Sequence, residues 1–329
     1  MKKIIYYTFY SEDGSDYYRS AGVFPYIKSK DFELVNLSHI KELGFSNLLG
    51  YDAIFIVRPH EEKHLNLIRM AKDCGLKVII DHDDNPLCLP NHHPLKGFFN
   101  ASKKNILSAV ALADEVWVST EAIKTAFKLY NRNIHVIPNA HNDYLFKVED
   151  KKPFVFNRVA MWRGGLSHIG DIYEPGVSEK LVELVNRNQD WKFFFLGQRF
   201  DWIEMHLTGN NCYRHDGATT IQFYKLMHEY NPCIFFYPLN NNLFNQSKSN
   251  CSWLESTYSG AAYFGNKDLP EFDKDCIFDL KLLKEGIEGS HHEGLAKANK
   301  ESWELICDEY LLSKVNKLRL KRIEKLFEI

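Results

Sequence analysis

One segment of this sequence combines the residue types that bind phosphate groups. It runs from residue 244 to residue 265 and reads FNQSKSNCSWLESTYSGAAYFG. A predicted helix over residues 249–259 follows a run of small polar side chains, and Gly260 ends it before a short apolar strand. Backbone N–H groups at a helix start, hydroxyl groups and one ammonium group together suit a diphosphate. The side chains expected to take part are Asn245, Ser247, Lys248 and Ser249.

The same predicted helix carries one acidic residue, Glu255. We place it about two turns into the helix, roughly 12 Å along the axis at 1.5 Å per residue. A carboxylate at that distance could bind the two hydroxyl groups of a ribose while the helix start binds the phosphates. The plainer alternative is a capped surface helix that binds no ligand.

A second candidate segment, DHDDNP, follows a predicted strand over residues 77–81 and contains Asp81, His82, Asp83 and Asp84 in a row. Crowding ionisable groups is unfavourable, and functional sites are where it occurs. Asp81 and Asp83 could bind Mn²⁺ or Mg²⁺ together with a diphosphate. One aspartate could instead act as a general base, and His82 could donate a hydrogen bond to a substrate oxygen. An acidic turn before Pro86 that caps a helix is the alternative.

A third candidate segment, WRGGLSH, follows the predicted strand at residues 154–162. Arg163 can pair with a phosphate through two hydrogen bonds, and His168 could reach a sugar or a phosphate. Gly164 and Gly165 would let the backbone approach a ligand closely, although two glycines also suit an ordinary tight turn.

Two further segments give weaker indications. SEDGSDYYR follows the first predicted strand, and its Asp13, Asp16 and Arg19 could face a cleft between domains or lie in a solvated turn. Gln198 follows Gly197 at the end of another strand and could touch a nucleotide base.

Strands that alternate with helices would position these segments. The first part of the chain has predicted strands at residues 3–9, 32–36, 53–57, 77–81, 115–119 and 134–138, and helices starting near 24 and covering 61–74, 105–113 and 121–130. After a polar linker at residues 142–153, strands at 154–162, 192–197, 233–238 and 261–265 alternate with helices at 177–188, 221–229 and 249–259. This alternation predicts parallel sheets covered on both faces.

We therefore expect an α/β protein with two Rossmann-like domains and a cleft between them. The first domain would cover residues 1–150, the second residues 151–300, and a helical tail residues 301–329. Ligands of open α/β sheets bind outside the carboxyl ends of the strands, and each candidate segment lies just after a strand.

Composition narrows the range of functions. The chain has 329 residues, 45% of them hydrophobic and 26% charged, which is typical of a globular protein with sizeable cores. A net charge of −2 provides no overall attraction to nucleic acid. The seven cysteines include no CxxC pair and fit reduced thiols in the cytoplasm. No stretch predicts a signal peptide or a membrane span.

Taken together, the segments resemble the second domain of GT-B glycosyltransferases, and in particular the retaining group called family four. The shared order is a strand with a glycine-rich turn, a strand ending in LG, a strand ending in PL, and NQSKS before a helix with a glutamate and a glycine. The resemblance implies that Arg163 and Lys248 hold the donor diphosphate and that Glu255 holds the ribose. The family usually has two glutamates separated by seven residues. Ser247 occupies the first position here, so Asn245 or Ser247 would replace that contact to the sugar ring.

The first part of the chain fits the same resemblance. KVIIDHDD is similar to the HD strand end of T-even phage α-glucosyltransferases, and LADEVWVSTEAIKTAF is similar to the ADxVxxS strand and helix that follow. The resemblance implies that His82 contacts the donor sugar. The whole combination is most similar to glycosyltransferases of tailed phages and of surface-polysaccharide clusters.

The resemblance implies that the protein transfers a sugar, with retention, from a nucleotide-sugar to an acceptor hydroxyl, and a UDP-sugar is the donor expected first. No metal or tightly bound cofactor would be needed, and the protein would work in the cytoplasm, that of the host if a phage encodes it. The acceptor would be a hydroxymethylated base of phage DNA or a sugar of a surface glycan. Two alternatives are a GT-A enzyme that uses Asp81 and Asp83 for a metal, and a non-catalytic module that binds nucleotide-sugars.

Overall fold

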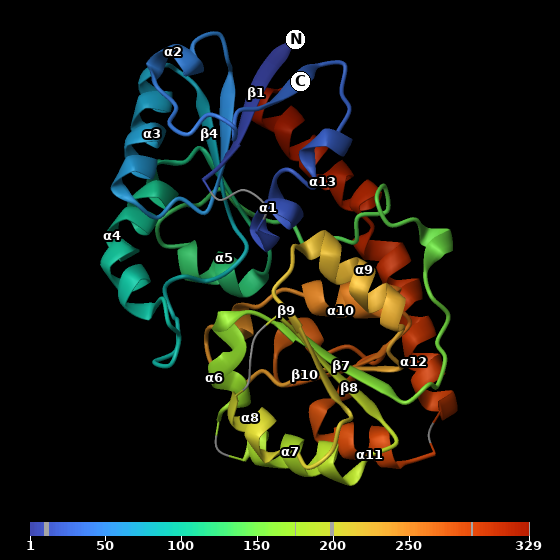
Figure 1. Ribbon diagram of the computed structural model, residues 1–329. Coiled ribbons are helices and arrows are strands. Elements are labelled where there is room, and N and C mark those ends of the chain that lie inside the picture. The colour runs from blue at the N-terminus through green and yellow to red at the C-terminus, as the bar shows by residue number, and fades with distance from the viewer. Residues whose placement is uncertain (10–12, 175, 198–200, 291, 329) are drawn as a thin grey trace.

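The structure, a computed structural model, describes residues 1–9, 13–174, 176–197, 201–290 and 292–328. Within these residues the strands form two six-stranded sheets, and every strand pairing is parallel. Helices cover the sheets, and the two α/β units lie one above the other (Figure 1). The predicted fold class, two Rossmann-like domains, is therefore confirmed.

The first domain is built on a sheet with the strand order β2-β1-β3-β4-β5-β6. Its strands are β1 (Lys2–Thr8), β2 (Phe32–Asn36), β3 (Ala53–Val57), β4 (Lys77–His82), β5 (Glu115–Val118) and β6 (Ile134–Val136). Its helices are α1 (Gly14–Arg19), the short 3₁₀ turn η1 (Phe24–Tyr26), α2 (Phe45–Leu48), α3 (Glu62–Asp73), α4 (Lys96–Leu112) and α5 (Glu121–Phe127).

The apolar runs of these strands are buried on both faces of the sheet, as parallel strands require. Ile5 and Tyr7 of β1 belong to the cluster that includes residues of α3 and α4. Ile4 and Tyr6 point the other way, into a cluster that contains residues of the last helix, because side chains alternate along a strand. Both faces are therefore covered, and the carboxyl edge of the sheet is left for the loops that carry the candidate residues.

The second domain repeats this design with the strand order β12-β11-β10-β7-β8-β9. Its strands are β7 (Val159–Gly164), β8 (Lys192–Gly197), β9 (Cys212–Asp216), β10 (Ile234–Tyr237), β11 (Ala262–Gly265) and β12 (Phe278–Asp279). Its helical elements include η3 (Leu166–His168), α6 (Ile169–Ile172), α7 (Val177–Arg187), α8 (Asp201–His206), α9 (Thr220–Tyr230), η4 (Asn245–Ser247), α10 (Cys251–Tyr258), α11 (Leu283–Glu288) and α12 (His292–Leu305).

The chain crosses between the domains at two places that lie side by side. The first is the connection from β6 to β7, which contains His141, and the second is a π-helical turn, Ile306–Tyr310, after α12. The backbone N–H of His141 donates to the carbonyl of Tyr310 at 2.8 Å, and the N–H of Leu312 donates to the carbonyl of His141 at 2.8 Å. The last helix, α13 (Leu312–Phe327), then packs on the first domain, where both chain termini lie (Figure 1).

Several predicted elements differ from the observed ones. The tail expected to be helical consists of the end of α12, the π-helical turn and α13, and it was not expected that α13 would pack on the first domain. Residues 11–19 were expected to form a loop, but Gly14–Arg19 is helical and Asp13 caps it by accepting from the N–H of Asp16. Strand β7 begins at Val159, five residues later than expected. The changeover between domains falls between β6 and β7; the exact limits 1–150, 151–300 and 301–329 stay a prediction.

Two expectations from composition can be compared with the structure. None of the described helices combines the length and the apolar character needed to cross a bilayer. All seven cysteines lie in the described residues and are free thiols.

Candidate functional site

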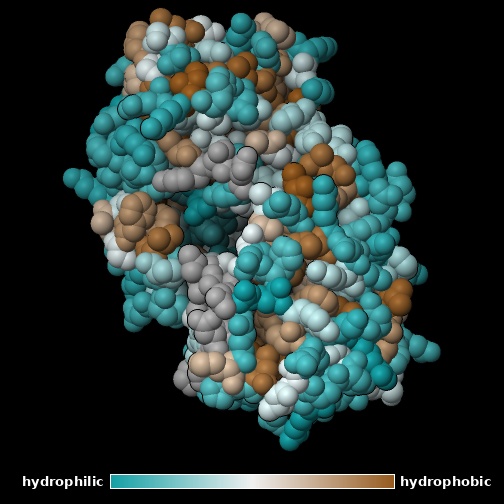
Figure 2. All heavy atoms as spheres, in the orientation of Figure 1, coloured by the Kyte–Doolittle hydropathy of each residue, from teal (hydrophilic) through white to brown (hydrophobic). Residues whose placement is uncertain are grey.

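The cleft between the domains contains a small cavity lined by both of them. Its volume is about 260 Å³, and it is lined by charged side chains from the carboxyl ends of the strands in each sheet. We call it the cation cavity, because Arg163 and Lys248 both line it. The space-filling view shows a hollow between the domains whose walls are largely hydrophilic (Figure 2). The predicted residues that line this cavity are Asp13, Asp83, Asp84, Arg163, Gly165, His168, Lys248 and Ser249.

Lys248 follows the short turn η4 and precedes α10, so it enters the cavity from the second domain. Its ammonium group lies 3.0 Å from a carboxylate oxygen of Asp84, which belongs to the first domain. It also lies 4.2 Å from the centre of the Phe244 ring. Burial raises the pKa of Asp84, but Lys248 more than offsets this and lowers the pKa below its ordinary value. The two domains thus meet here through an ion pair.

Arg163 at the end of β7 forms a second ion pair with Glu255 of α10. Glu255 is 0% exposed, and it also accepts a hydrogen bond of 2.7 Å from the hydroxyl of Tyr18 in α1. Its Oε2 has no hydrogen-bond partner among the described residues. Burial raises the pKa of Glu255, which Arg163 and Tyr18 oppose, and the carboxylate raises the pKa of Arg163. Helix α10 begins at Cys251, so Glu255 lies about one turn into it and not about two turns as expected.

The glycine-rich turn after β7 serves two purposes. A Cβ at Gly164 would lie 2.5 Å from the Trp162 ring, so Gly164 is required by packing within the domain. A Cβ at Gly165 would meet nothing within 4 Å, and Gly165 lines the cation cavity, so its backbone is open to a ligand. His168 lies at the cavity wall with its Nε2 2.8 Å from the hydroxyl of Tyr237. Burial lowers the pKa of His168 and keeps its ring neutral.

Four of the predicted residues that do not line the cation cavity are buried and make contacts within the protein instead. The side-chain amide of Asn245 donates to Asp171 at 2.7 Å, and the Ser247 hydroxyl donates to a backbone carbonyl of its own segment at 3.1 Å. Asp16 is buried in α1. The Arg19 side chain is 0% exposed and makes a bidentate pair with Asp81 at 2.7 and 2.8 Å. Arg19 therefore does not face the cleft as expected.

The pairing of Asp81 with Arg19 also bears on the predicted metal motif, because Asp81 is turned into the domain interior. Asp83 instead faces the cleft, where the Ser15 hydroxyl donates to it at 2.6 Å. Asp81 and Asp83 therefore do not face a common metal position. The alternative of a GT-A fold is excluded by the second parallel sheet.

One group of side chains in the described part of the chain has the spacing of a metal site: His60, Glu61 and His64. The Nδ1 of His64 accepts hydrogen bonds from the backbone N–H groups of His60 and Glu61 at 3.0 and 3.1 Å. Burial lowers the pKa of His64 to about 3, so the ring is neutral and its proton must be on Nε2. A protonated Nε2 cannot coordinate a metal, and this group fits the capping of α3 better than a metal site.

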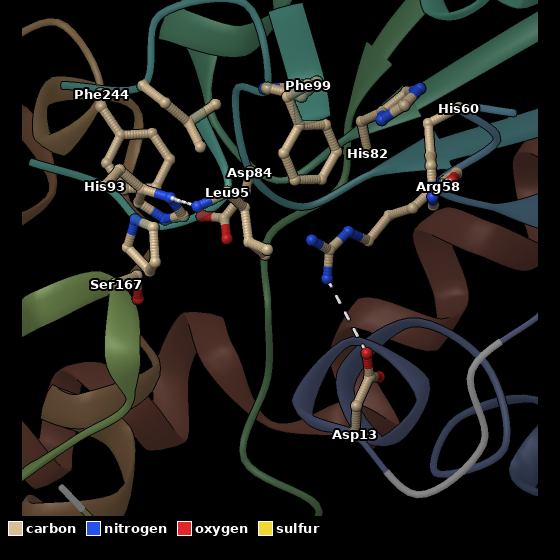
Figure 3. Close-up of a pocket in the computed structure, with 13 residues that line it drawn as sticks. Asp13, Arg58, His60, His82, Asp84, His93, Leu95, Phe99, Ser167 and Phe244 are labelled. Atoms are coloured by element: carbon tan, nitrogen blue, oxygen red, sulfur yellow. Dashed lines mark hydrogen bonds and ion pairs between the residues drawn. The ribbon is translucent and has the colours of Figure 1, made fainter. Parts of the chain in front are cut away.

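A larger cavity of about 460 Å³ lies beside the cation cavity and shares Asp13, Arg58, Asp84 and Ser167 with it. We call it the histidine cavity, because His60, His82 and His93 line it (Figure 3). His82 of β4 is 2% exposed, and its Nε2 has no hydrogen-bond partner among the described residues. Burial lowers the pKa of His82 to about 3, so it is a neutral group at the cavity wall.

Sequence reasoning missed Arg58 and Tyr18. Arg58 lines both cavities, and Figure 3 shows its side chain directed toward Asp13. Its φ of 50° is unusual for a residue other than glycine, which is typical of functional positions. Its place directly after the buried strand AIFIV was a usable signal, since the other candidates also follow strands. Tyr18 gave no such signal. Gln198 lies outside the described residues.

Comparison with known proteins supports the fold. No protein-family model and no curated sequence matches this chain. Among solved structures, HepE from Anabaena in complex with UDP-glucose is 12% identical, with 99% of this chain and 100% of that chain covered and a TM-score of 0.63. TarM is 15% identical at a TM-score of 0.57, and the match covers 82% of this chain but only 54% of TarM. The pneumococcal O-GlcNAc transferase GtfA, in complex with UDP and GlcNAc, is 10% identical at a TM-score of 0.58, with 87% and 59% covered.

These likenesses and the two facing Rossmann-like domains define the fold as GT-B. At such low identity they establish the architecture and no more. The predicted closeness to phage enzymes, the cytoplasmic location and the roles of the single residues stay predictions.

Proposed function

We propose that this protein is a glycosyltransferase that moves a sugar from a nucleotide-sugar, most simply a UDP-sugar, to an acceptor hydroxyl with retention of configuration. The observation that carries the proposal is the cation cavity, in which Arg163, Lys248 and the start of α10 face one another in the interdomain cleft. Proteins of this fold have been solved with UDP or UDP-glucose bound, which supports a nucleotide-sugar as the donor.

In the proposed reaction, the bond between the sugar C1 and the diphosphate oxygen breaks, and a bond from C1 to the acceptor oxygen forms on the same face. The acceptor proton passes to the departing phosphate oxygen, so no further base is required. Lys248, Arg163 and the backbone N–H groups at the start of α10 stabilise the negative charge that develops on the leaving diphosphate. From the wall of the neighbouring histidine cavity, His82 would offer its neutral imidazole to a sugar hydroxyl.

The ion pairs of the cation cavity imply an exchange of partners on donor binding. Lys248 can contact a diphosphate only by loosening its contact with Asp84, and Arg163 shares its charge with Glu255. The proposal allows two acceptors: a hydroxyl of a hydroxymethylated DNA base, or a hydroxyl of a glycan. A non-catalytic donor-binding module is the second candidate, since residues that bind a donor need not transfer it.

The proposal is tested with Lys248→Ala. Wild-type protein with UDP at about a hundredfold excess over Kd should gain about 2.7 kcal/mol of stability. The variant should lose most of this gain and most of the turnover of a UDP-sugar, because the leaving diphosphate loses a buried cation. The control is Lys281→Ala, whose side chain is 77% exposed and lies outside the cleft cavities. Full UDP binding by Lys248→Ala would contradict the site, and UDP binding without transfer or hydrolysis of any UDP-sugar would favour the non-catalytic module.

A further inference from the structure

The histidine cavity has a chemical character different from that of the cation cavity beside it. Its charged lining consists of Asp13, Asp84 and Arg58. With the ion-pair partners Asp83 of Arg58 and Lys248 of Asp84 included, three carboxylates and two cations give a formal charge of −1. Arg58 lies 3.8 Å from Asp13 and 3.6 Å from Asp83, so carboxylates surround this cation. A negatively charged ligand would therefore be repelled more than attracted in this cavity.

The histidines of the cavity add hydrogen-bonding groups without adding charge. The Nδ1 of His93 accepts from the backbone N–H of Leu95 at 3.1 Å, so its Nε2 carries the proton and can donate. Burial lowers the pKa of His93 to about 4 and that of His82 to about 3, so both rings are neutral near pH 7. The buried Nε2 of His82 has no partner within the described residues, and a ligand in the cavity could supply one.

Apolar side chains form the rest of the wall. Phe99 and Leu95 come from the first domain and Phe244 from the second (Figure 3). The faces of aromatic rings carry partial negative charge and attract polarised C–H groups such as those on one face of a sugar ring. Carboxylates and neutral imidazoles, in turn, exchange hydrogen bonds with hydroxyl groups. The lining therefore combines the two kinds of contact that a sugar ring offers.

We propose that the histidine cavity binds the acceptor and that the acceptor is an uncharged saccharide. Because this cavity shares Asp13, Arg58, Asp84 and Ser167 with the cation cavity, a saccharide bound there presents a hydroxyl next to the donor sugar. This inference rests on the proposed function, and it favours the glycan over the DNA acceptor. A DNA strand carries one phosphate per nucleotide, and neither the lining nor a chain of net charge −2 attracts it.

The test uses saturation-transfer NMR on the whole protein with UDP present. The probes are methyl α-glucopyranoside, methyl β-galactopyranoside and methyl N-acetyl-β-glucosaminide, with glucuronic acid and glucose 6-phosphate as charged counterparts. A DNA duplex containing 5-hydroxymethylcytosine is added in a separate competition. We expect transfer to the ring protons of at least one methyl glycoside, binding of the charged sugars weaker by about fivefold or more, and no competition by the duplex.

Two substitutions, one at the N-cap of helix α4 and one at its other end, test whether the glycoside signal comes from the histidine cavity. Leu95→Glu replaces an apolar side chain of the cavity wall with a hydrated carboxylate, which cannot pack against the C–H face of a sugar ring; Leu95 is 50% exposed and is not needed for the core. It should weaken glycoside binding by about fivefold or more. Leu112→Glu makes the same change at the other end of the helix, at a side chain that is 38% exposed, and should leave glycoside binding within about twofold.

Each other outcome has a defined meaning. Equal or stronger binding of the charged sugars, competition by the duplex, loss of the glycoside signal on adding UDP, or no effect of Leu95→Glu would overturn the inference. If UDP raises the melting temperature but none of the methyl glycosides gives a saturation-transfer signal, the inference is overturned and the donor site stands. Glycoside binding without any UDP shift would contradict the proposed function and still support the saccharide site.

Discussion

Arg163 and Lys248 of the cation cavity each pair with a carboxylate, one within a domain and the other across the cleft. Arg163 pairs with a glutamate of its own domain, whereas Lys248 pairs with Asp84 across the cleft. A pair within a domain keeps its geometry when the domains move, but a pair across the cleft must break when they separate. Asp84 therefore competes with any diphosphate for Lys248.

Asp84→Asn should strengthen UDP binding. Removing a partly exposed competitor, 32% exposed at the side chain, should favour the complex by about 0.5–1 kcal/mol, or roughly two- to fivefold in Kd, and less at high salt. Calorimetric titration with UDP at low and high salt measures this. Asp190→Asn removes the carboxylate of a surface pair with Arg158 and should have no effect. Unchanged or weaker UDP binding by Asp84→Asn would rule out the competition.

His141 at the domain junction should make stability depend on pH. Its ring is 0% exposed, and burial lowers its pKa from 6.5 to about 4, so the folded protein holds it neutral. Below pH 6.5 the unfolded chain takes up a proton that the folded chain does not, which stabilises the unfolded state as the pH falls. His141→Gln should therefore remove up to about 1.4 kcal/mol per pH unit of acid destabilisation between pH 6.5 and 4.

Urea unfolding of the wild type and of His141→Gln across this range checks the prediction. Glutamine retains an N–H donor for the carbonyl of Phe146, which His141 contacts at 2.9 Å, so the comparison isolates the titration. His39→Gln, which replaces an exposed histidine, is the matched control. Parallel curves for the wild type and His141→Gln would show that His141 is not the titrating group.

At the level of elements, most of the described strands could be predicted, but β9 and β12 were missed, and the partners of the strands could not be predicted. Runs such as AIFIV and KFFFLG are continuous and apolar, which indicates buried parallel strands, and both were placed correctly. The helix α1 was missed because six polar and aromatic residues carry no helical period. The amphipathic pattern of α13 shows that one face is buried, but it does not indicate which sheet covers that face.

The packing of α13 on the first domain should contribute a large part of that domain's free energy of unfolding. Ile323 is 1% exposed within the cluster that contains Trp117 of β5, so Ile323→Ala should cost about 2–4 kcal/mol. Leu318, on the outer face of the same helix at 48% exposed, gives the control Leu318→Ala with a cost of about 0.5 kcal/mol or less. Urea unfolding followed by tryptophan fluorescence compares them, and equal costs would mean that α13 does not pack as described.

The candidate site was predictable in its residue types but not in its pairings. Arg163, Lys248 and Ser249 were placed in one cleft by the rule that ligands bind at the carboxyl ends of strands. The rule does not say which carboxylate each cation meets, because pairing depends on side-chain directions across two domains. For the same reason Arg19 was expected in the cleft, whereas the structure pairs it with Asp81 inside the first domain.

At the level of the whole molecule, polar contacts hold the two domains together across the cleft. Tyr18 donates to Glu255 at 2.7 Å, and Asn139 donates to Ser249 at 2.8 Å. These contacts join α1 and the β6 loop of the first domain to α10 and the segment that precedes it. Movement of one domain is thus coupled to the cation cavity.

Tyr18→Phe should loosen the domains without opening a void. It removes a hydrogen bond to a buried carboxylate, which is worth about 1.5–3 kcal/mol, and leaves the ring in place. Small-angle X-ray scattering without ligand should show a larger radius of gyration than in the wild type. Tyr130→Phe, at a side chain that is 44% exposed, serves as the control. A scattering curve identical to that of the wild type would mean that this contact does not hold the domains together.

The paired crossings at His141 and Leu312 have a mechanical consequence. A single connecting segment would let one domain rotate about several axes relative to the other. Two crossings that are hydrogen-bonded to each other through the backbone of His141 define one hinge axis. They permit bending about that axis and resist twisting of one domain against the other. We therefore expect any opening of the cleft to follow one path, so that closing brings the carboxyl edges of the two sheets back into the same alignment.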